Sequence, residues 1–194
     1  MRLTGEAEFA DAATGLFWPV RTKSQFGRTV CFLDGNGSPV GIPSQGRYTT
    51  QERHFLAARS GANGARYHVG IDLFGDFHDL IVACESGTIL NFQPFYHGVW
   101  KLFLQCDSGL VINYGEVDER SLKDFNLKPG DRVQAGQPLA RIGRMSGGSS
   151  MLHFETYPPG TRDNVRFWAA DPPSQLGKIR NPTQYLLALA RLGR

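Results

Sequence analysis

Hydrophobic and polar positions form short runs along the chain, which predict β-strands separated by turns. Residues 79–84 are apolar after the first position, as is typical of a strand buried in a sheet. Residues 99–106 and 110–114 are two further strand-like runs, and Asp107-Ser108-Gly109 between them predicts a hairpin. Residues 151–157 alternate, so Leu152, Phe154 and Thr156 are predicted to face the core, opposite to the intervening positions.

The N-terminal part of the chain has a weaker pattern. Residues 1–15 predict a loose arm, residues 16–20 a first strand and residues 25–32 a further strand. Glycine, serine and proline recur throughout residues 34–50, which predicts a loop or a hairpin that forms a lid.

The C-terminal part predicts a hairpin and one helix. Residues 127–143 read as turn, strand, turn and strand. Carrier domains for lipoyl and biotinyl groups have such a hairpin, but no lysine stands at the Ala135-Gly136 turn here, which disfavours that class. Residues 184–192 predict a short amphipathic helix, with Asn181 as its cap and Pro182 at its first position. The sequence therefore predicts an all-β dominated fold of antiparallel sheets with a short C-terminal helix.

Composition fits one globular domain. The chain has 194 residues, of which 41% are hydrophobic and 20% charged. We expect residues 1–60 to form an N-terminal arm, first strand and lid-like loops, and residues 61–194 to form the main unit. The net charge is only +3, and no Lys/Arg run is interleaved with aromatic residues, so a nucleic-acid partner is not expected. The sequence does not indicate an oligomeric state.

The cysteines and the N-terminal residues indicate which cellular compartment the protein suits. Cys31, Cys84 and Cys106 are an odd number without a C-x-x-C motif, which favours reduced, buried thiols. Pairing of Cys84 with Cys106 stays open. The first residues lack an apolar segment, so no secretory signal is expected, and no run approaches about 18 apolar residues, so no membrane span is expected.

Candidate chemistry centres on His68 and Asp72, an imidazole and a carboxylate four residues apart with Gly70 between them. Four extended residues span about 13 Å, whereas atoms that bind one zinc ion lie only a few ångströms apart. The segment must therefore bend, and Gly70 is where the backbone bends at least cost. A helix is disfavoured because Val69, Gly70 and Ile71 are poor helix formers.

A metal needs a third ligand, and His153 is the best candidate. Two histidines and one carboxylate are a known zinc ligand set that leaves one position open for water. The alternative is a half-buried strand whose histidine and aspartate hold no metal, since a lone H-x-x-x-D arises easily by chance. Glu155 is expected to orient a ligand histidine rather than to bind the metal. Arg47, Arg53 and Arg59 precede the pair and are read as solvated charges.

The motif R-x-H-x-G-x-D-L at residues 66–73, followed by L-H-F-E at residues 152–155, resembles the LytM or lysostaphin-type zinc metalloendopeptidases. These enzymes cut peptide cross-bridges in bacterial cell walls. The resemblance implies an open, groove-lined β-fold similar to a duplicated-hybrid or barrel-sandwich motif. It implies Zn²⁺ as cofactor, with His68, Asp72 and His153 as ligands, and it implies that an arginine near residues 47–59 pairs with a site carboxylate.

Two positions depart from the family pattern. The family's second metal motif is H-x-H, and Met151 stands where its first, catalytic histidine would be. The family also has a catalytic histidine after a Tyr-Gly or Tyr-x pair, and here Glu116 follows Tyr114-Gly115. By the period of two, Tyr114 and Glu116 are predicted to share one face of a strand. Met151 is expected to pack, because a thioether is a poor base and a poor zinc ligand.

The resemblance leaves two hypotheses for function. The first is a zinc endopeptidase acting on cell-wall peptide, with zinc-bound water as nucleophile, Glu116 as substitute general base and Tyr114 as a donor to the oxyanion. The second is a zinc-binding module that no longer cuts and binds cell-wall peptide or a protein partner. His78 and His97 are candidates for a replacement catalytic imidazole. The sequence leaves the localisation open: a cell-wall substrate would require delivery to the periplasm or cell wall by a phage particle, a secretion system or a signal that has been trimmed.

Overall fold

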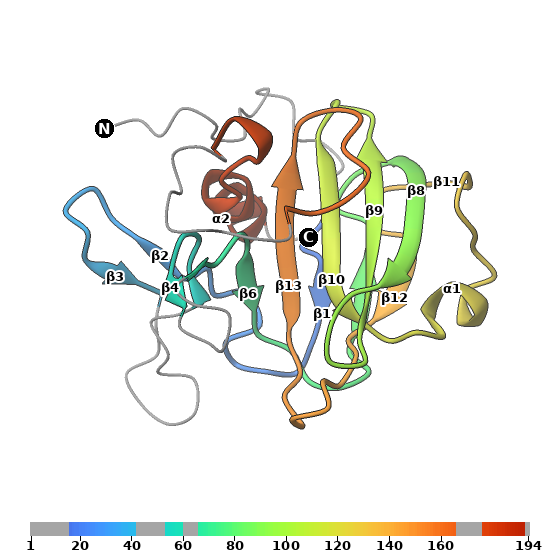
Figure 1. The fold of residues 1–194 in the computed structure, drawn as a ribbon, viewed down its shortest axis with the longest axis horizontal. Coiled ribbons are helices and arrows are strands. Elements are labelled where there is room, and N and C mark those ends of the chain that lie inside the picture. Colours follow the sequence, from blue (N-terminus) through green and yellow to red (C-terminus); the bar gives the residue numbers. More distant parts are fainter. Residues whose placement is uncertain (1–15, 42–52, 60–65, 166–175, 193–194) are drawn as a thin grey trace.

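A six-stranded antiparallel sheet dominates the structure, a computed structural model that describes residues 16–41, 53–59, 66–165 and 176–192 (Figure 1). The strands in order across the sheet are β11 (Arg132–Val133), β8 (Gly87–Pro94), β9 (Trp100–Cys106), β10 (Val111–Val117), β13 (Leu152–Tyr157) and β6 (Ile71–Leu73). The all-β dominated fold class with antiparallel sheets and a short helix is confirmed.

A second, three-stranded sheet packs on the first to form the core. It consists of β1 (Val20–Arg21), β7 (Leu80–Val82) and β12 (Pro138–Arg141). Tyr114 of β10 shows how the sheets meet: its ring lies edge-on to Phe154, and its hydroxyl accepts a hydrogen bond of 2.9 Å from the backbone N–H of Cys84. Leu102, Ile112 and Phe154 on this face are fully buried. Each such side chain contributes about 1.5–3 kcal/mol through burial, which fixes the face.

The central strands β8, β9 and β10 are joined by tight turns. Between β8 and β9 the backbone N–H of Val99 donates to Tyr96 O at 3.0 Å, and His97 and Gly98 have φ of 47° and 82°. Two left-handed residues give the twist that a two-residue hairpin needs. Between β9 and β10 the predicted hairpin is confirmed, with Gly109 at φ 92° in its turn.

Short elements complete the described chain. Two small hairpins pair β2 (Phe32–Leu33) with β3 (Pro39–Val40) and β4 (Ala58–Arg59) with β5 (Arg66–Tyr67), and the helical elements are α1 (Ser121–Asp124), η4 (Leu176–Lys178) and α2 (Thr183–Leu192). The predicted cap of α2 is confirmed, since Asn181 Oδ1 accepts the backbone N–H of Thr183 at 3.0 Å. No helix in the described part of the chain is long and apolar enough to cross a membrane.

Two local predictions were wrong. Residues 25–28 form a turn rather than a strand, because Trp18 Nε1 donates to Gly27 O and Phe26 packs on Phe74, so tertiary contacts override the apolar run. Residues 127–143 do not form a hairpin: β11 pairs with β8 and β12 pairs with β7, in different sheets. The predicted boundary near residue 60 lies outside the described residues and stays a prediction.

The outer face of the six-stranded sheet carries a row of functional positions. Asp72 lies opposite His153 in the β6–β13 pair, His153 lies opposite Gly115, and Gly115 lies opposite Lys101. Directly opposed residues of antiparallel strands share a face. The sheet register therefore places Asp72 and His153 side by side, although 81 residues separate them in sequence.

We predict that Gly70→Ala destabilises the protein by about 1–3 kcal/mol, because a Cβ at Gly70 would lie 2.5 Å from the backbone oxygen of Phe154 and 3.0 Å from the His153 ring. Chemical denaturation measures the effect. Gly35→Ala is the control, because a Cβ at Gly35 meets nothing within 4 Å, and it should change stability by less than about 0.5 kcal/mol. Equal stability of both variants would contradict the close-approach role of Gly70.

Candidate metal centre

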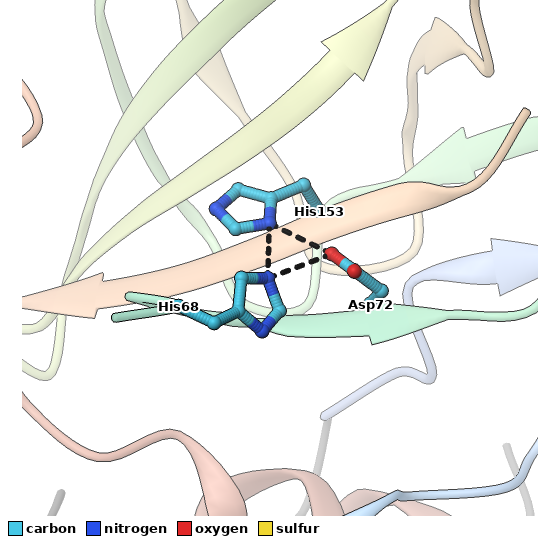
Figure 2. A group of neighbouring side chains, drawn as sticks. All are labelled: His68, Asp72 and His153. Carbon is cyan, nitrogen blue, oxygen red and sulfur yellow. Dashed lines mark hydrogen bonds and ion pairs between the residues drawn. The ribbon is translucent and has the colours of Figure 1, made fainter. Parts of the chain in front are cut away.

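Three side chains point their ligand atoms at one place (Figure 2). His68 Nε2 lies 3.0 Å from Asp72 Oδ1, His153 Nδ1 lies 2.8 Å from the same oxygen, and the two nitrogens are 3.0 Å apart. All three residues are buried. The structure thus brings together the three residues that the sequence suggested as ligands.

Local structure bends the His68–Asp72 segment as the spacing requires. Strand β5 ends at Tyr67 and β6 begins at Ile71, so residues 68–70 form the bend. The backbone of His68 pairs with the preceding segment, accepting from Leu56 N at 2.7 Å and donating to Ala57 O at 2.8 Å. Gly70 serves this bend through close approach to β13, not through a left-handed backbone.

In each imidazole, the nitrogen that points away from the cluster (the outer nitrogen) lies next to a hydrogen-bond acceptor. This acceptor determines whether the inner nitrogen, which points into the cluster, carries a proton or a lone pair. His68 Nδ1 lies 2.9 Å from the backbone oxygen of His54, and His153 Nε2 lies 2.9 Å from Glu155 Oε1. When these outer nitrogens carry the protons, both inner nitrogens are lone pairs. Three lone pairs then meet at one point, an arrangement that only a cation stabilises.

The donor set fits a zinc ion. Tetrahedral zinc with bonds of about 2.1 Å holds its ligand atoms about 3.4 Å apart, a few tenths of an ångström beyond the spacings found here. Two imidazoles and one carboxylate match the three protein ligands of a catalytic zinc site, and outer acceptors such as Glu155 are the usual support for ligand histidines.

The pKa shifts of Asp72 and His153 show that the cluster favours a positive charge at its centre. Burial raises the pKa of Asp72, but His68 and His153 outweigh burial and hold it well below its usual range. Burial lowers the pKa of His68. Burial also opposes the charged form of His153, yet its hydrogen bonds to Asp72 and Glu155 raise its pKa to about 10. A proton on His153 and a metal ion therefore compete for the same place.

Arg59 binds the outer oxygen of Asp72. Its Nη2 lies 3.2 Å from Asp72 Oδ2, while Oδ1 faces the two histidines. The pairing that the family resemblance implied is therefore found in Arg59, and the prediction of a solvated side chain was wrong for this residue. Arg59 fixes which oxygen of Asp72 points inward.

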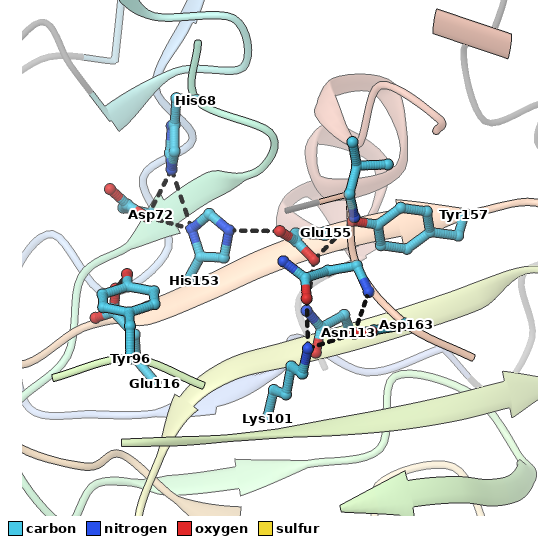
Figure 3. A network of polar contacts seen from close by, with 12 residues as sticks. His68, Asp72, Tyr96, Lys101, Asn113, Glu116, His153, Glu155, Tyr157 and Asp163 are labelled. Carbon is cyan, nitrogen blue, oxygen red and sulfur yellow. Dashed lines mark hydrogen bonds and ion pairs between the residues drawn. The ribbon is translucent and has the colours of Figure 1, made fainter. Parts of the chain in front are cut away.

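Both oxygens of the Glu155 carboxylate accept hydrogen bonds within a buried network (Figure 3). Glu155 is fully buried and accepts from His153, from Asn113 Nδ2 at 2.5 Å and from the hydroxyl of Tyr157 at 2.9 Å. Burial raises its pKa, but these donors together lower it below the usual value. The expected role of Glu155, which is to orient His153 from outside the ligand set, matches these contacts.

Glu116 reaches the outer face of the sheet through a β-bulge. Gly115 pairs with Lys101 and Val117 with Trp100, so Glu116 is an extra residue in β10, and its φ is 62°. Tyr96 donates its hydroxyl proton to Glu116 Oε1, whereas Oε2 is buried and has no partner among the described residues. In Figure 3 this pair lies next to Asp72 and His153.

The surroundings of Glu116 raise the pKa of its carboxyl toward neutral pH. Burial raises its pKa to about 7, the negative charge of Asp72 adds to the rise, and His153, the Tyr96 hydrogen bond and Arg53 oppose it. A carboxyl poised near pH 7 can accept or release a proton at little cost. Glu116 is only 2% exposed, so its carboxyl is buried in the protein rather than solvated.

Tyr114 does not join the centre, so the prediction that it shares a face with Glu116 was wrong. The bulge breaks the period of two between them: Tyr114 points into the core and accepts from Cys84, while Glu116 turns to the outer face. Met151 accepts a long contact from Arg53 Nη1 at 3.8 Å, as expected for a packing residue. No sequence pattern indicated Tyr96, because its role depends on the β8–β9 turn.

The other histidines lie outside the cluster. His78 Nε2 is 3.4 Å from Asp118 Oδ2, and the His97 ring packs edge-on against Tyr96. In the described part of the chain, only His68, Asp72 and His153 form a group able to hold a metal. The prediction of reduced thiols is confirmed, since Cys31, Cys84 and Cys106 are free and buried.

Comparisons with known proteins identify the family and support the fold. A sequence model of Peptidase family M23 matches residues 66–165. No curated protein sequence matches the chain. The catalytic domain of the antimicrobial peptidase lysostaphin from Staphylococcus simulans is similar in structure, with 22% identity, a TM-score of 0.52, and coverage of 69% of this chain and 89% of that domain. This likeness supports the fold.

Longer proteins match over part of their length. The chain covers 55% of lysostaphin in solution, with 20% identity and a TM-score of 0.48. It covers 40% of Csd3 from Helicobacter pylori, with 19% identity and a TM-score of 0.47.

We predict that His153→Ala abolishes stoichiometric zinc binding and that Glu155→Gln weakens it about 10–100-fold, because a neutral amide oxygen holds the His153 proton outward more weakly than a carboxylate does. Competition with a chromophoric chelator measures both affinities. Asp124→Asn, on an exposed carboxylate, is the control and should bind like the wild type. Unchanged zinc affinity in His153→Ala would contradict the proposed ligand set.

A second prediction concerns the metal-free protein. Glu116 has a raised pKa in the folded state, so its stabilising contribution is complete below its ordinary pKa of 4.5 and is lost as pH rises through about 7. Glu116→Gln should therefore exceed the wild type in free energy of unfolding at pH 8, by on the order of 3 kcal/mol, and match it below pH 4.5. Urea denaturation with chelator present tests this, and a difference independent of pH would contradict it.

Proposed function

The chain belongs to Peptidase family M23, and we propose that it is a zinc-dependent endopeptidase of this family in which Glu116 acts as the general base. The observation that carries the proposal is the Glu116 carboxylate, which lies next to the metal-ligand cluster in Figure 3 and whose Oε2 is buried with no partner among the described residues. A buried acceptor left without a donor costs free energy, so it indicates a partner that arrives with the substrate.

His68 Nε2, Asp72 Oδ1 and His153 Nδ1 would hold the metal, with Arg59 and Glu155 fixing their orientation. When bound, zinc would lower the pKa of water to about 7 and polarise the carbonyl of the bond to be cut. The ligands come from β13, from β6 and from the bend before β6, so sheet pairing rather than a mobile loop sets their geometry.

Glu116 would take the proton from the water that attacks the peptide bond. Tyr96 occupies Oε1 through its hydroxyl, so Oε2 is the oxygen left to accept that proton. The bulge holds the carboxylate on the outer face, and its raised pKa near 7 matches an operating pH near neutrality. The same carboxyl could then return the proton to the departing amine, because neither protonation state is strongly disfavoured.

The substrate class follows from the family. The proposed substrate is the peptide part of bacterial peptidoglycan, and the proposed place of action is the periplasm or cell wall. The second candidate is a zinc-binding module without activity. It is favoured by Met151 and Glu116, which stand where the family resemblance implies two catalytic histidines.

Cell-wall digestion separates the two candidates. We predict that the zinc-loaded wild type releases peptides from purified peptidoglycan and that Glu116→Gln lowers the rate about 10²–10⁴-fold, because Gln cannot accept the proton. Glu119→Gln, on an exposed carboxylate nearby in sequence, is the matched control and should cut at the wild-type rate. Zinc content is measured for all three proteins.

Two results would count against this assignment. Equal rates for Glu116→Gln and the wild type would remove Glu116 as the base. A wild type that binds peptidoglycan with full zinc content but releases no peptide would favour the binding module instead.

A further inference from the structure

Arg53 is a buried cation that has no hydrogen-bonded anionic partner among the described residues. The residue is 9% exposed, and its Nη1 lies 3.8 Å from the sulfur of Met151. Its guanidinium carbon lies 4.4 Å from the centre of the Phe74 ring. Its Nε is buried and has no hydrogen-bond partner in the part of the chain that the structure describes. One edge of the guanidinium, Nε with Nη2, is therefore not used by a described acceptor.

This environment is unfavourable for a buried guanidinium unless an anion pairs with it. A thioether is a weak acceptor, and a phenyl face offers a cation only a modest attraction. A buried charge normally requires a paired counter-charge with good hydrogen bonds. Among the described residues, none supplies one. The positive charge of Arg53 lowers the pKa of Glu116, but no hydrogen bond joins the two side chains. The missing partner is an anion that comes from outside this part of the chain.

The position of Arg53 shows where that anion would lie. Met151 precedes His153 by two residues, and Phe74 follows Asp72 by two, so both contacts of Arg53 lie one pleat beyond the paired metal ligands. Two residues of strand correspond to about 7 Å. Because β10 runs antiparallel to β13, the bulge at Glu116 lies toward the same end. The guanidinium therefore stands about two peptide positions from the ligands, on the side of the proposed base.

We propose that Arg53 binds a carboxylate of the peptide substrate through its Nε–Nη2 edge. This assignment rests on the proposed function, because it places a substrate on the outer face of the sheet. A guanidinium fork matches a carboxylate in two parallel hydrogen bonds, which explains why an arginine and not a lysine suits the position. At about 7 Å from the ligands, Arg53 reaches a neighbouring residue of the peptide rather than the carbonyl that is attacked. The preferred substrate is then an acidic peptide.

The carboxylate has two possible sources in a peptidoglycan stem peptide: its C-terminus or the free carboxyl of an internal residue. The test uses one stem peptide in three forms, with all carboxyls free, with only the C-terminus amidated, and with only the internal carboxyls amidated. We expect one amidated form to lose at least about 100-fold in kcat/KM with the wild type, since a buried donor left unpaired rejects the neutral analogue. The form that loses identifies the source.

Arg53→Met tests the residue itself. Met keeps apolar contact with Met151 and Phe74, so the variant should fold at least as stably as the wild type by thermal unfolding, and it should cut all three forms equally slowly. Arg53→Lys keeps the charge without the fork and should discriminate less than the wild type. Equal cutting of all three forms by the wild type, or unchanged discrimination in Arg53→Met, overturns the proposal. If Arg53→Met does not fold, Arg53→Lys and the wild-type comparison decide.

Binding separates this proposal from the proposed function. Titration calorimetry of the zinc-loaded protein with the same three peptides reports recognition without cleavage. If no peptide is cut but the free form binds at least about 100-fold tighter than one amidated form, and Arg53→Met abolishes that difference, Arg53 recognition stands while the endopeptidase assignment fails. If peptides are cut without any preference for a free carboxyl, the endopeptidase assignment stands and Arg53 recognition fails.

Discussion

Three lone pairs that converge on one point are the constraint around which the site is built. Inward-facing nitrogens of His68 and His153 and one oxygen of Asp72 lie within 3.0 Å of each other. Such a cluster exists only with a cation at its centre, either a proton or a metal ion. The surrounding contacts all serve it: backbone and Glu155 acceptors hold the histidines outward-protonated, and Arg59 holds the second oxygen of Asp72 away.

The two ends of this centre differ in whether their charged groups have hydrogen-bond partners. Toward Glu155, both carboxylate oxygens have donors, which supports His153, although Asn113 Oδ1 has no partner among the described residues. Toward Met151, two buried atoms of opposite charge, Glu116 Oε2 and Arg53 Nε, lack partners among the described residues. Unsatisfied buried charged groups reduce stability, so this pair of opposite charges marks the side at which a ligand would complete it.

Sequence patterns predicted the parts of the site that depend on regular geometry. Order and spacing of motifs sufficed for His68, Asp72 and His153 as a group, and alternation placed Phe154 in the core. The pattern failed at Tyr114 and Glu116, because a single extra residue with φ of 62° reverses the face and no propensity marks it. Tyr96 was not predicted, and the prediction of a solvated Arg53 was wrong, since both side chains act through contacts with segments remote in sequence.

A carboxylate at position 116, in place of an imidazole, adds a second negative charge beside Asp72. The groups around Glu116 offset this charge. An imidazole next to Asp72 would gain a proton easily, whereas a second carboxylate is repelled, and this repulsion together with burial lifts its pKa to about 7. A base of this kind is useful only if its charged form is not suppressed further. Arg53, the Tyr96 hydroxyl and the His153 ring each lower that pKa, and a divalent metal on Asp72 would lower it again. Metal binding would then act on the base as well as on the water, because the positive charge of the ion would lower the pKa of both.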